Sequence, residues 1–198
     1  MIAVINFNWK EEKKVEVNQA IKARRSYRSF ANIEVTEDLV EDLAAAASLA
    51  PSCYNNQPWR YVFVSGNQLE TLHTALADGN EWAKKASLII AIFSKSEEDC
   101  IVDGREYYLF DVGLSVQNLM LRATELGLVT HLMAGYDADQ VKEILNIPQE
   151  MELISLMAVG GKADQVDPDL SPEQKKTEKN RPERFPVEKF IYYEQVSE

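Results

Sequence analysis

Residues 24–28 read Arg-Arg-Ser-Tyr-Arg in an acidic chain, which has 32 Asp and Glu residues against 21 Lys and Arg and a formal net charge of −11. Arginine suits phosphate because its parallel N–H donors can match two phosphate oxygens. A second interpretation stays open, since Arg24 and Arg25 lie where an N-terminal helix should end and cations there favour the helix dipole. An acidic chain does not gather nucleic acid by bulk attraction, so a small anionic partner is expected and a nucleic-acid partner is not.

Residues 50–59 read Ala-Pro-Ser-Cys-Tyr-Asn-Asn-Gln-Pro-Trp and form the second informative segment. Two prolines bracket three carboxamides and a hydroxyl, and an aromatic residue then enters a strand. Carboxamides offer both donors and acceptors, which the edge of a heteroaromatic ring with carbonyl and N–H groups requires. From these residues alone, a polar turn whose side chains satisfy their own backbone is the better interpretation.

The bulk composition indicates one globular domain. The chain has 198 residues, of which 45% are hydrophobic and 27% charged, and no apolar run approaches the roughly 20 residues of a membrane helix. Residues 1–14 are apolar first and charged afterwards, the reverse of a signal peptide. We therefore expect a cytoplasmic location and no membrane partner.

Periodicity predicts alternating helices and strands. Helices are expected over residues 15–23, 36–47, 68–77, 105–126 and 138–145, and strands over 61–64, 88–93, 128–133 and 153–159. From residue 162 to 186 the chain is polar and proline-bearing, and an apolar patch follows at residues 190–193. Such a segment has difficulty packing on its own domain, so we expect an arm that lies across a partner subunit.

Together the two segments resemble the FMN-dependent nitroreductase family, whose patterns are Arg-Arg-Ser-x-Arg and Ala-Pro-Ser-x-x-Asn-x-Gln-Pro-Trp. The likeness continues through residues 111–127, 135–148, the strand ending at Gly160, and Arg184-Phe185-Pro186. It implies an α+β fold with a central mixed sheet flanked by helices. It also implies an intertwined homodimer that binds FMN at its interface, each chain being one domain of residues 1–198 with an arm, residues 163–198, on the partner subunit.

The resemblance also implies the cofactor-binding residues, position by position. The flavin phosphate, ribityl chain and pyrimidine edge would be held by Arg24, Arg25, Ser26 and Arg28. The residues that would reach the FMN of the other subunit are Pro51, Ser52, Cys53 and Asn55. The isoalloxazine would lie against Met133, Ala134 and Gly135, with backbone N–H groups near N5. Further contacts are expected from Arg184, from Arg181 as a weaker candidate, and from Asn80, where the alignment needs a gap.

The expected chemistry is hydride transfer from NADH or NADPH through flavin N5 to an electron-poor small molecule such as a nitroaromatic, quinone or activated alkene. No side chain is expected to be catalytic, because the cofactor carries the reaction. Two alternatives remain: a flavoenzyme of the same fold with another reaction, such as a dehalogenase or enone reductase, and a non-catalytic flavin-binding or sensing protein. Larger relatives often carry substrate-shaping helices where this chain has the short acidic segment 93–107.

The histidines and cysteines suggest no further chemistry. Packing roles are expected for His73 and His131, and no cluster with metal-ligand spacing is present, so no metal is expected. Nothing in the sequence pairs Cys53 with Cys100. We expect Cys53 to be a buried, inert cysteine rather than a reactive thiol.

Overall fold

The computed structural model describes residues 17–196, so the expectations for residues 1–14 and for the helix start at residue 15 lie outside it. The long apolar run of the sequence is the strand β3 (Leu88–Ser94), which lies between β2 (Arg60–Val64) and β7 (Glu152–Lys162) and is antiparallel to both. Successive side chains of a strand point to opposite faces. Ile89 belongs to one core cluster and Ile90 to the other. Both faces are covered, which explains why the run does not alternate with polar residues.

The sheet has the strand order β1 (Phe30–Ala31), β7, β3, β2, and β6 (Leu128–Met133) also pairs with β7. All of these ladders are antiparallel, and an isolated parallel bridge joins Ser26 to Thr130. This bridge places the segment that precedes β1 beside β6. The expected α+β fold with helices around a central sheet is confirmed. The expectation of a mixed sheet is wrong, because its strands pair only in antiparallel ladders.

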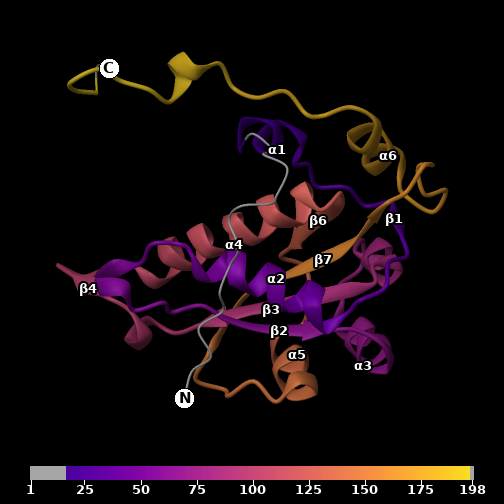
Figure 1. Ribbon diagram of the computed structural model, residues 1–198, viewed down its shortest axis with the longest axis horizontal. Helices are drawn as coiled ribbons and strands as arrows, with labels where there is room; N and C mark the ends of the chain where they lie inside the picture. The colour runs from indigo at the N-terminus through magenta and orange to yellow at the C-terminus, as the bar shows by residue number, and fades with distance from the viewer. Residues whose placement is uncertain (1–16, 197–198) are drawn as a thin grey trace.

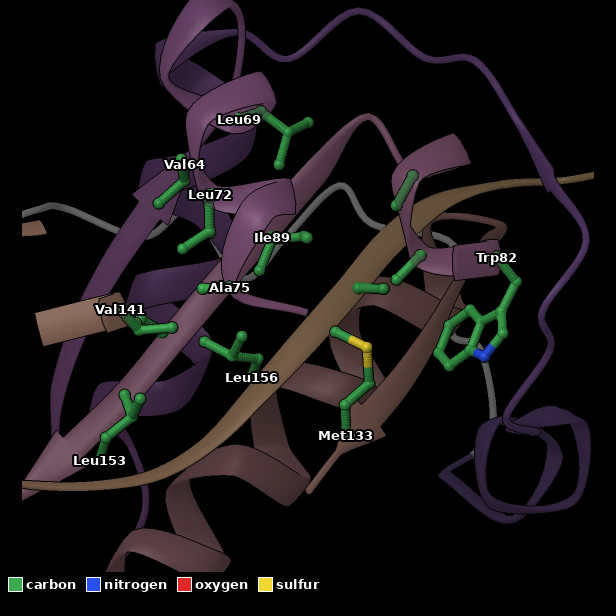
Figure 2. Close-up of a cluster of buried hydrophobic side chains, with 14 of the residues drawn as sticks. Val64, Leu69, Leu72, Ala75, Trp82, Ile89, Met133, Val141, Leu153 and Leu156 are labelled. Carbon is green, nitrogen blue, oxygen red and sulfur yellow. The ribbon is translucent and has the colours of Figure 1, made fainter. Parts of the chain in front are cut away.

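Two layers of helices cover the sheet (Figure 1). On one face α2 (Glu37–Ser48) packs against α4 (Tyr108–Glu125), and α1 (Val17–Ala23) also contacts α4. On the other face lie α3 (Asn67–Leu72), continued by the short helix η2 (His73–Ala75), and α5 (Ala138–Leu145). Figure 2 shows this second core, in which Leu72, Val141 and Leu156 meet between the helices and the strands. None of the described helices has the length and apolar character needed to cross a membrane.

Two expected boundaries are wrong for local reasons. The long helix begins at Tyr108 rather than at residue 105, because Arg105–Glu106 forms β5 and pairs with β4 (Ile101–Val102). Asp103 and Gly104, both with positive φ, make the turn between them, as an Asp-Gly pair commonly does in tight hairpins. The helix expected over 68–77 ends earlier, in η2. In contrast, β6 and α5 have the predicted bounds.

The polar stretch after β7 contains a helix that periodicity did not indicate, α6 (Pro172–Lys179). Its start has a sequence signature, since Ser171 and Gln174 form a capping box and Pro172 occupies the first turn. Leu170, with 4% of its surface exposed, belongs to the core of its own chain. The chain therefore leaves the domain only after α6, and Figure 1 shows the remaining segment, with the short helix η5 (Val187–Lys189), running past α1 and away from the sheet.

Candidate cofactor site

A pocket of about 230 Å³ lies where the arginine segment meets the chain after α6. It is lined by Arg24, Arg25, Ser26, Arg28, His131, Thr177, Arg181, Pro182 and Arg184. The structure thus brings together six of the residues that the resemblance assigned to the phosphate and its surroundings, from segments about 150 positions apart in the sequence. The pocket is rich in guanidinium groups although the chain as a whole is acidic.

Close backbone packing holds the arginine segment in place. Phe30 and Ala31 pair with Lys162 and Gly161 at the end of β7. A Cβ atom at Gly160 would lie 2.9 Å from Cδ1 of Phe30, so this strand end can approach β1 only without a side chain there. Ser29 is buried, and its Oγ accepts a hydrogen bond from the N–H of Asp167.

The cationic groups of the pocket lack full charge compensation. Burial lowers the pKa of Arg24, and the neighbouring charges of Arg181 and Arg184 lower it further. The Arg28 guanidinium lies 5.6 Å over the Trp82 ring, and its buried Nε has no hydrogen-bond partner among the described residues. An oxyanion in the pocket would offset this repulsion and accept from these donors.

Two of the expected cofactor-binding arginines also donate hydrogen bonds to the backbone of the protein itself. The Nη2 of Arg25 donates to the carbonyl of Glu178, 2.8 Å away at the end of α6, and also to that of Thr177. The Nη2 of Arg181 donates to the carbonyls of Lys22 and Arg24 at the end of α1. These guanidiniums bind the last carbonyls of two helices, as cations at helix C-termini commonly do. The helix-end interpretation therefore describes Arg25 correctly, but the helix is α6 rather than α1.

His131 also lines this pocket, although the sequence suggested only a packing role. Its Nδ1 lies 3.0 Å from the carbonyl oxygen of Tyr27, which can only accept, so Nδ1 carries the proton. Its ring centroid lies 4.4 Å from that of Trp82. Burial, followed by the charge of Arg28, lowers the pKa of His131 to about 4. The ring is therefore neutral at physiological pH.

A second group of expected residues lies at the end of β6. The Nδ2 of Asn80 donates to the carbonyl of Gly135 at 2.8 Å, and a Cβ atom at Gly135 would lie 2.7 Å from that Nδ2. Met133 is buried in the core, and its carbonyl accepts from Ser155 Oγ, while Ala134 is exposed. Asn80 precedes the helix η3 (Glu81–Lys85), which contains Trp82. Trp82 connects this group to Arg28 and His131.

The third expected group, residues 51–55, lies elsewhere in the molecule. Its short helix η1 (Cys53–Asn55) is joined to the segment before β4, and Figure 1 shows β4 and α6 at opposite ends of the molecule. The expectation of an inert, unpaired Cys53 is wrong, because Cys53 forms a disulfide with Cys100, across a Cα–Cα distance of 6.1 Å. Sequence reasoning missed the bond because the partner lies 47 positions away.

The comparisons with known proteins identify the family. The model described as "Nitroreductase family" matches residues 21–87 and 76–161, which is most of the chain. The chain belongs to the nitroreductase family. This nitroreductase-family chain is similar to a solved structure named "oxidoreductase containing FMN", with a TM-score of 0.80 and 25% identity over 94% of this chain and 96% of that one.

Two curated relatives of this family member carry different functional names. An "NADH dehydrogenase" of Thermus thermophilus is 25% identical over 78% of this chain and 90% of its own length. An "iodotyrosine deiodinase" of Haliscomenobacter hydrossis is 26% identical over 82% of this chain and 87% of its own length. Family membership therefore leaves the electron acceptor open.

The lowered pKa of His131 predicts an acid-sensitive fold. The unfolded imidazole titrates near 6.5, and the folded one near 4. Stability from the neutral ring is therefore complete above pH 6.5 and is lost as the pH falls toward 4. Between pH 7.5 and pH 5 we expect His131 to contribute a loss of about 2 kcal/mol. Urea unfolding at both pH values should show a smaller loss in His131→Asn, which keeps a donor for the Tyr27 carbonyl. Equal losses in both proteins would contradict this assignment.

Proposed function

We propose that this nitroreductase-family protein is an FMN-dependent oxidoreductase, acting in the cytoplasm, that transfers hydride from NADH or NADPH to an electron-poor small molecule. The observation that carries the proposal is the arginine pocket, whose crowded cationic groups favour an anion. Trp82 connects this pocket to the group formed by Asn80 and Gly135. The structural relative named for FMN and the relative named NADH dehydrogenase support the cofactor and the donor.

The residues of the pocket fit the phosphate end of FMN. A phosphate dianion would supply acceptors for the unpartnered Nε of Arg28 and would relieve the repulsion that lowers the pKa of Arg24. The pocket volume of about 230 Å³ is smaller than the roughly 300–1,000 Å³ of sites that enclose a drug-sized ligand. A flavin ring would therefore extend beyond this pocket, and the exposed Ala134 and the amide of Asn80 would be the residues that hold it.

The residues around the pocket have different roles in the proposed mechanism. Arg24, Arg28 and Arg184 bind the phosphate, and Arg25 fixes α6 so that the pocket keeps its shape. Bound FMN would supply the chemistry, taking up hydride from the nicotinamide and delivering it to the acceptor. His131 is neutral, so only the arginines would offset the negative charge of the phosphate. Its ring forms the part of the pocket wall that lies beside Trp82.

We further propose that two chains form the complete site. Residues 51–55 lie at the other end of the protomer from the arginine pocket, so they can approach a flavin only in a second copy. The segment after α6 exposes large apolar side chains, namely Phe185, Val187, Phe190, Ile191, Tyr192, Tyr193 and Val196. Exposed apolar groups of this extent indicate a covering surface, and a partner subunit that also completes the site accounts for both observations.

The phosphate assignment predicts a specific loss on arginine removal. Arg24→Ala should weaken FMN binding about 10- to 100-fold, since a hydrogen bond to a charged group contributes roughly 1.5–3 kcal/mol. Quenching of flavin fluorescence on titration measures the dissociation constant. Arg105→Ala is the matched control, because Arg105 is an exposed arginine of the β4–β5 hairpin. Full FMN affinity in Arg24→Ala would remove the phosphate assignment.

Reductive titration tests the proposed reaction. The purified protein should be yellow, should bleach when NADH or NADPH is added without oxygen, and should recover its colour with a nitroaromatic or quinone acceptor. Because a relative is named iodotyrosine deiodinase, a halogenated tyrosine belongs in the acceptor panel. Reoxidation by that compound alone would favour the dehalogenase alternative. A protein that binds FMN but does not accept electrons from either nicotinamide would be a flavin-binding protein without this activity.

Removal of residues 185–198 tests the role of the arm. The shortened protein keeps Arg184 but loses the exposed apolar segment, and we expect it to form fewer dimers and to bind FMN more weakly. Light scattering coupled to size-exclusion chromatography measures the mass. A full-length protein that is monomeric yet binds FMN would contradict a site shared between subunits. A shortened protein that remains fully dimeric would place the interface elsewhere.

A further inference from the structure

The Cys53–Cys100 disulfide joins two exposed segments rather than two parts of the core. Residues 54–57 on one side and 101–106 on the other are all exposed. In the first segment Tyr54, Asn55 and Gln57 have positive φ, which costs energy for residues other than glycine. In the second, the β4–β5 hairpin pairs only two residues a strand and is marginal by itself. Opening the disulfide can therefore release both segments while the core stays folded.

Two carboxyl groups lie beside this disulfide. Asp111, with 3% of its surface exposed, accepts from the backbone N–H of Cys53 at 2.6 Å. Asp99 directly precedes Cys100, and its Oδ1 accepts from Asn56 Nδ2 at 3.2 Å. Its Oδ2 is buried and accepts no hydrogen bond from an N–H or a hydroxyl among the described residues. A carboxyl oxygen of Asp99 and both sulfur atoms lie within 4.8 Å of one another.

The Asp99 carboxyl influences the protonation of Asp111. Burial raises the pKa of Asp111, and the nearby Asp99 carboxyl raises it further, against the opposing effect of the Cys53 N–H. Two ionised carboxylates held close together repel each other, so one of them gains a proton more readily than an isolated carboxylate does. A disulfide that only crosslinks two segments takes part in no proton transfer and therefore needs no proton carrier. The conversion of a disulfide to two thiols does require protons.

We propose that Cys53 and Cys100 form a reversible dithiol–disulfide site, with the Asp99–Asp111 carboxyl pair as its proton carrier and a dithiol as its reductant. A thiolate of the reductant attacks one sulfur, the S–S bond breaks, and the other cysteine leaves as a thiolate. That thiolate takes the proton held by the carboxyl pair. The reductant's second thiol returns a proton to the pair and attacks the mixed disulfide, and the first cysteine, released as a thiolate, takes a proton from solvent. The protein gains two electrons and two protons, and the reductant becomes a disulfide.

Reduction would also change the cofactor site, a consequence that rests on the proposed function. Residues 51–55 are expected to contact FMN in the partner subunit, and the disulfide tethers them to the hairpin. Once untethered, residues 54–57 can leave their costly backbone conformation, and the loop must be ordered again when flavin binds. The oxidised protein should therefore hold FMN more tightly than the reduced one.

The full-length native protein treated with dithiothreitol provides the test. Free thiols are trapped with iodoacetamide over time and counted by mass spectrometry, a measurement that does not depend on flavin. We expect complete reduction without unfolding, and re-formation of the bond on transfer to oxidised dithiothreitol. Asp99→Asn, which keeps an acceptor for Asn56, should slow reduction about tenfold or more, as loss of a proton carrier does. Asp103→Asn is the control, since Asp103 is an exposed aspartate of the adjacent hairpin.

The outcomes distinguish a failure of the redox proposal from a failure of the proposed function. A disulfide that is reduced only after denaturation has a structural role alone, and this result would overturn the proposal. Equal rates of reduction for Asp99→Asn and Asp103→Asn would also overturn it. Flavin titration of the oxidised and reduced forms should show about a tenfold weaker FMN affinity on reduction, and equal affinities would overturn the effect on the loop. Failure of both forms to bind FMN would refute the proposed function, while the thiol measurement would still decide the redox site.

Discussion

The buried carboxylate of Glu178 is the contact on which the arginine pocket depends. Its oxygens accept from the backbone N–H groups of Arg28 and Ser29 at 2.9–3.2 Å, and only 5% of the residue is exposed. A buried charge is tolerated when it is hydrogen-bonded, and here the bonds run from the C-terminal helix to the N-terminal segment. Arg25 completes the connection from the opposite direction through the carbonyls of α6. Without this pair of contacts, Arg184 would have no reason to lie near Arg24.

Local sequence signals were sufficient for most elements but not for this contact. The bounds of α5 were predictable because Asp137 caps the N–H of Gln140 and the apolar residues have helical spacing. The helix α6 was missed because it is almost entirely polar, and its apolar support, Leu170, lies outside the helix. A polar helix of this kind is stabilised by its capping box and by bonds to distant residues. The first is visible in the sequence as Ser171 and Gln174, and the second is not.

The candidate site, too, was predictable from the sequence in part only. The resemblance named the arginines and Asn80, and the structure brings each set into contact with its neighbours. It could not distinguish Arg25 and Arg181, which bind helix carbonyls, from Arg28, whose Nε has no partner among the described residues. It also said nothing of His131 as a pocket wall or of the Cys53–Cys100 bond, because both depend on which distant segments pack together.

The end of the molecule with α6 and the end with β4 therefore have different functions in the proposed enzyme. The end with α6 contains the cationic groups that suit a phosphate. The other end has residues 51–55 and the short acidic segment 93–107, which contains the β4–β5 hairpin. The disulfide joins the two, and in the proposed dimer residues 51–55 would lie near the partner's flavin. Acceptor selection and the redox state of Cys53 and Cys100 would then be set by the same few residues, so the oxidised and reduced forms can differ in substrate preference as well as in cofactor affinity.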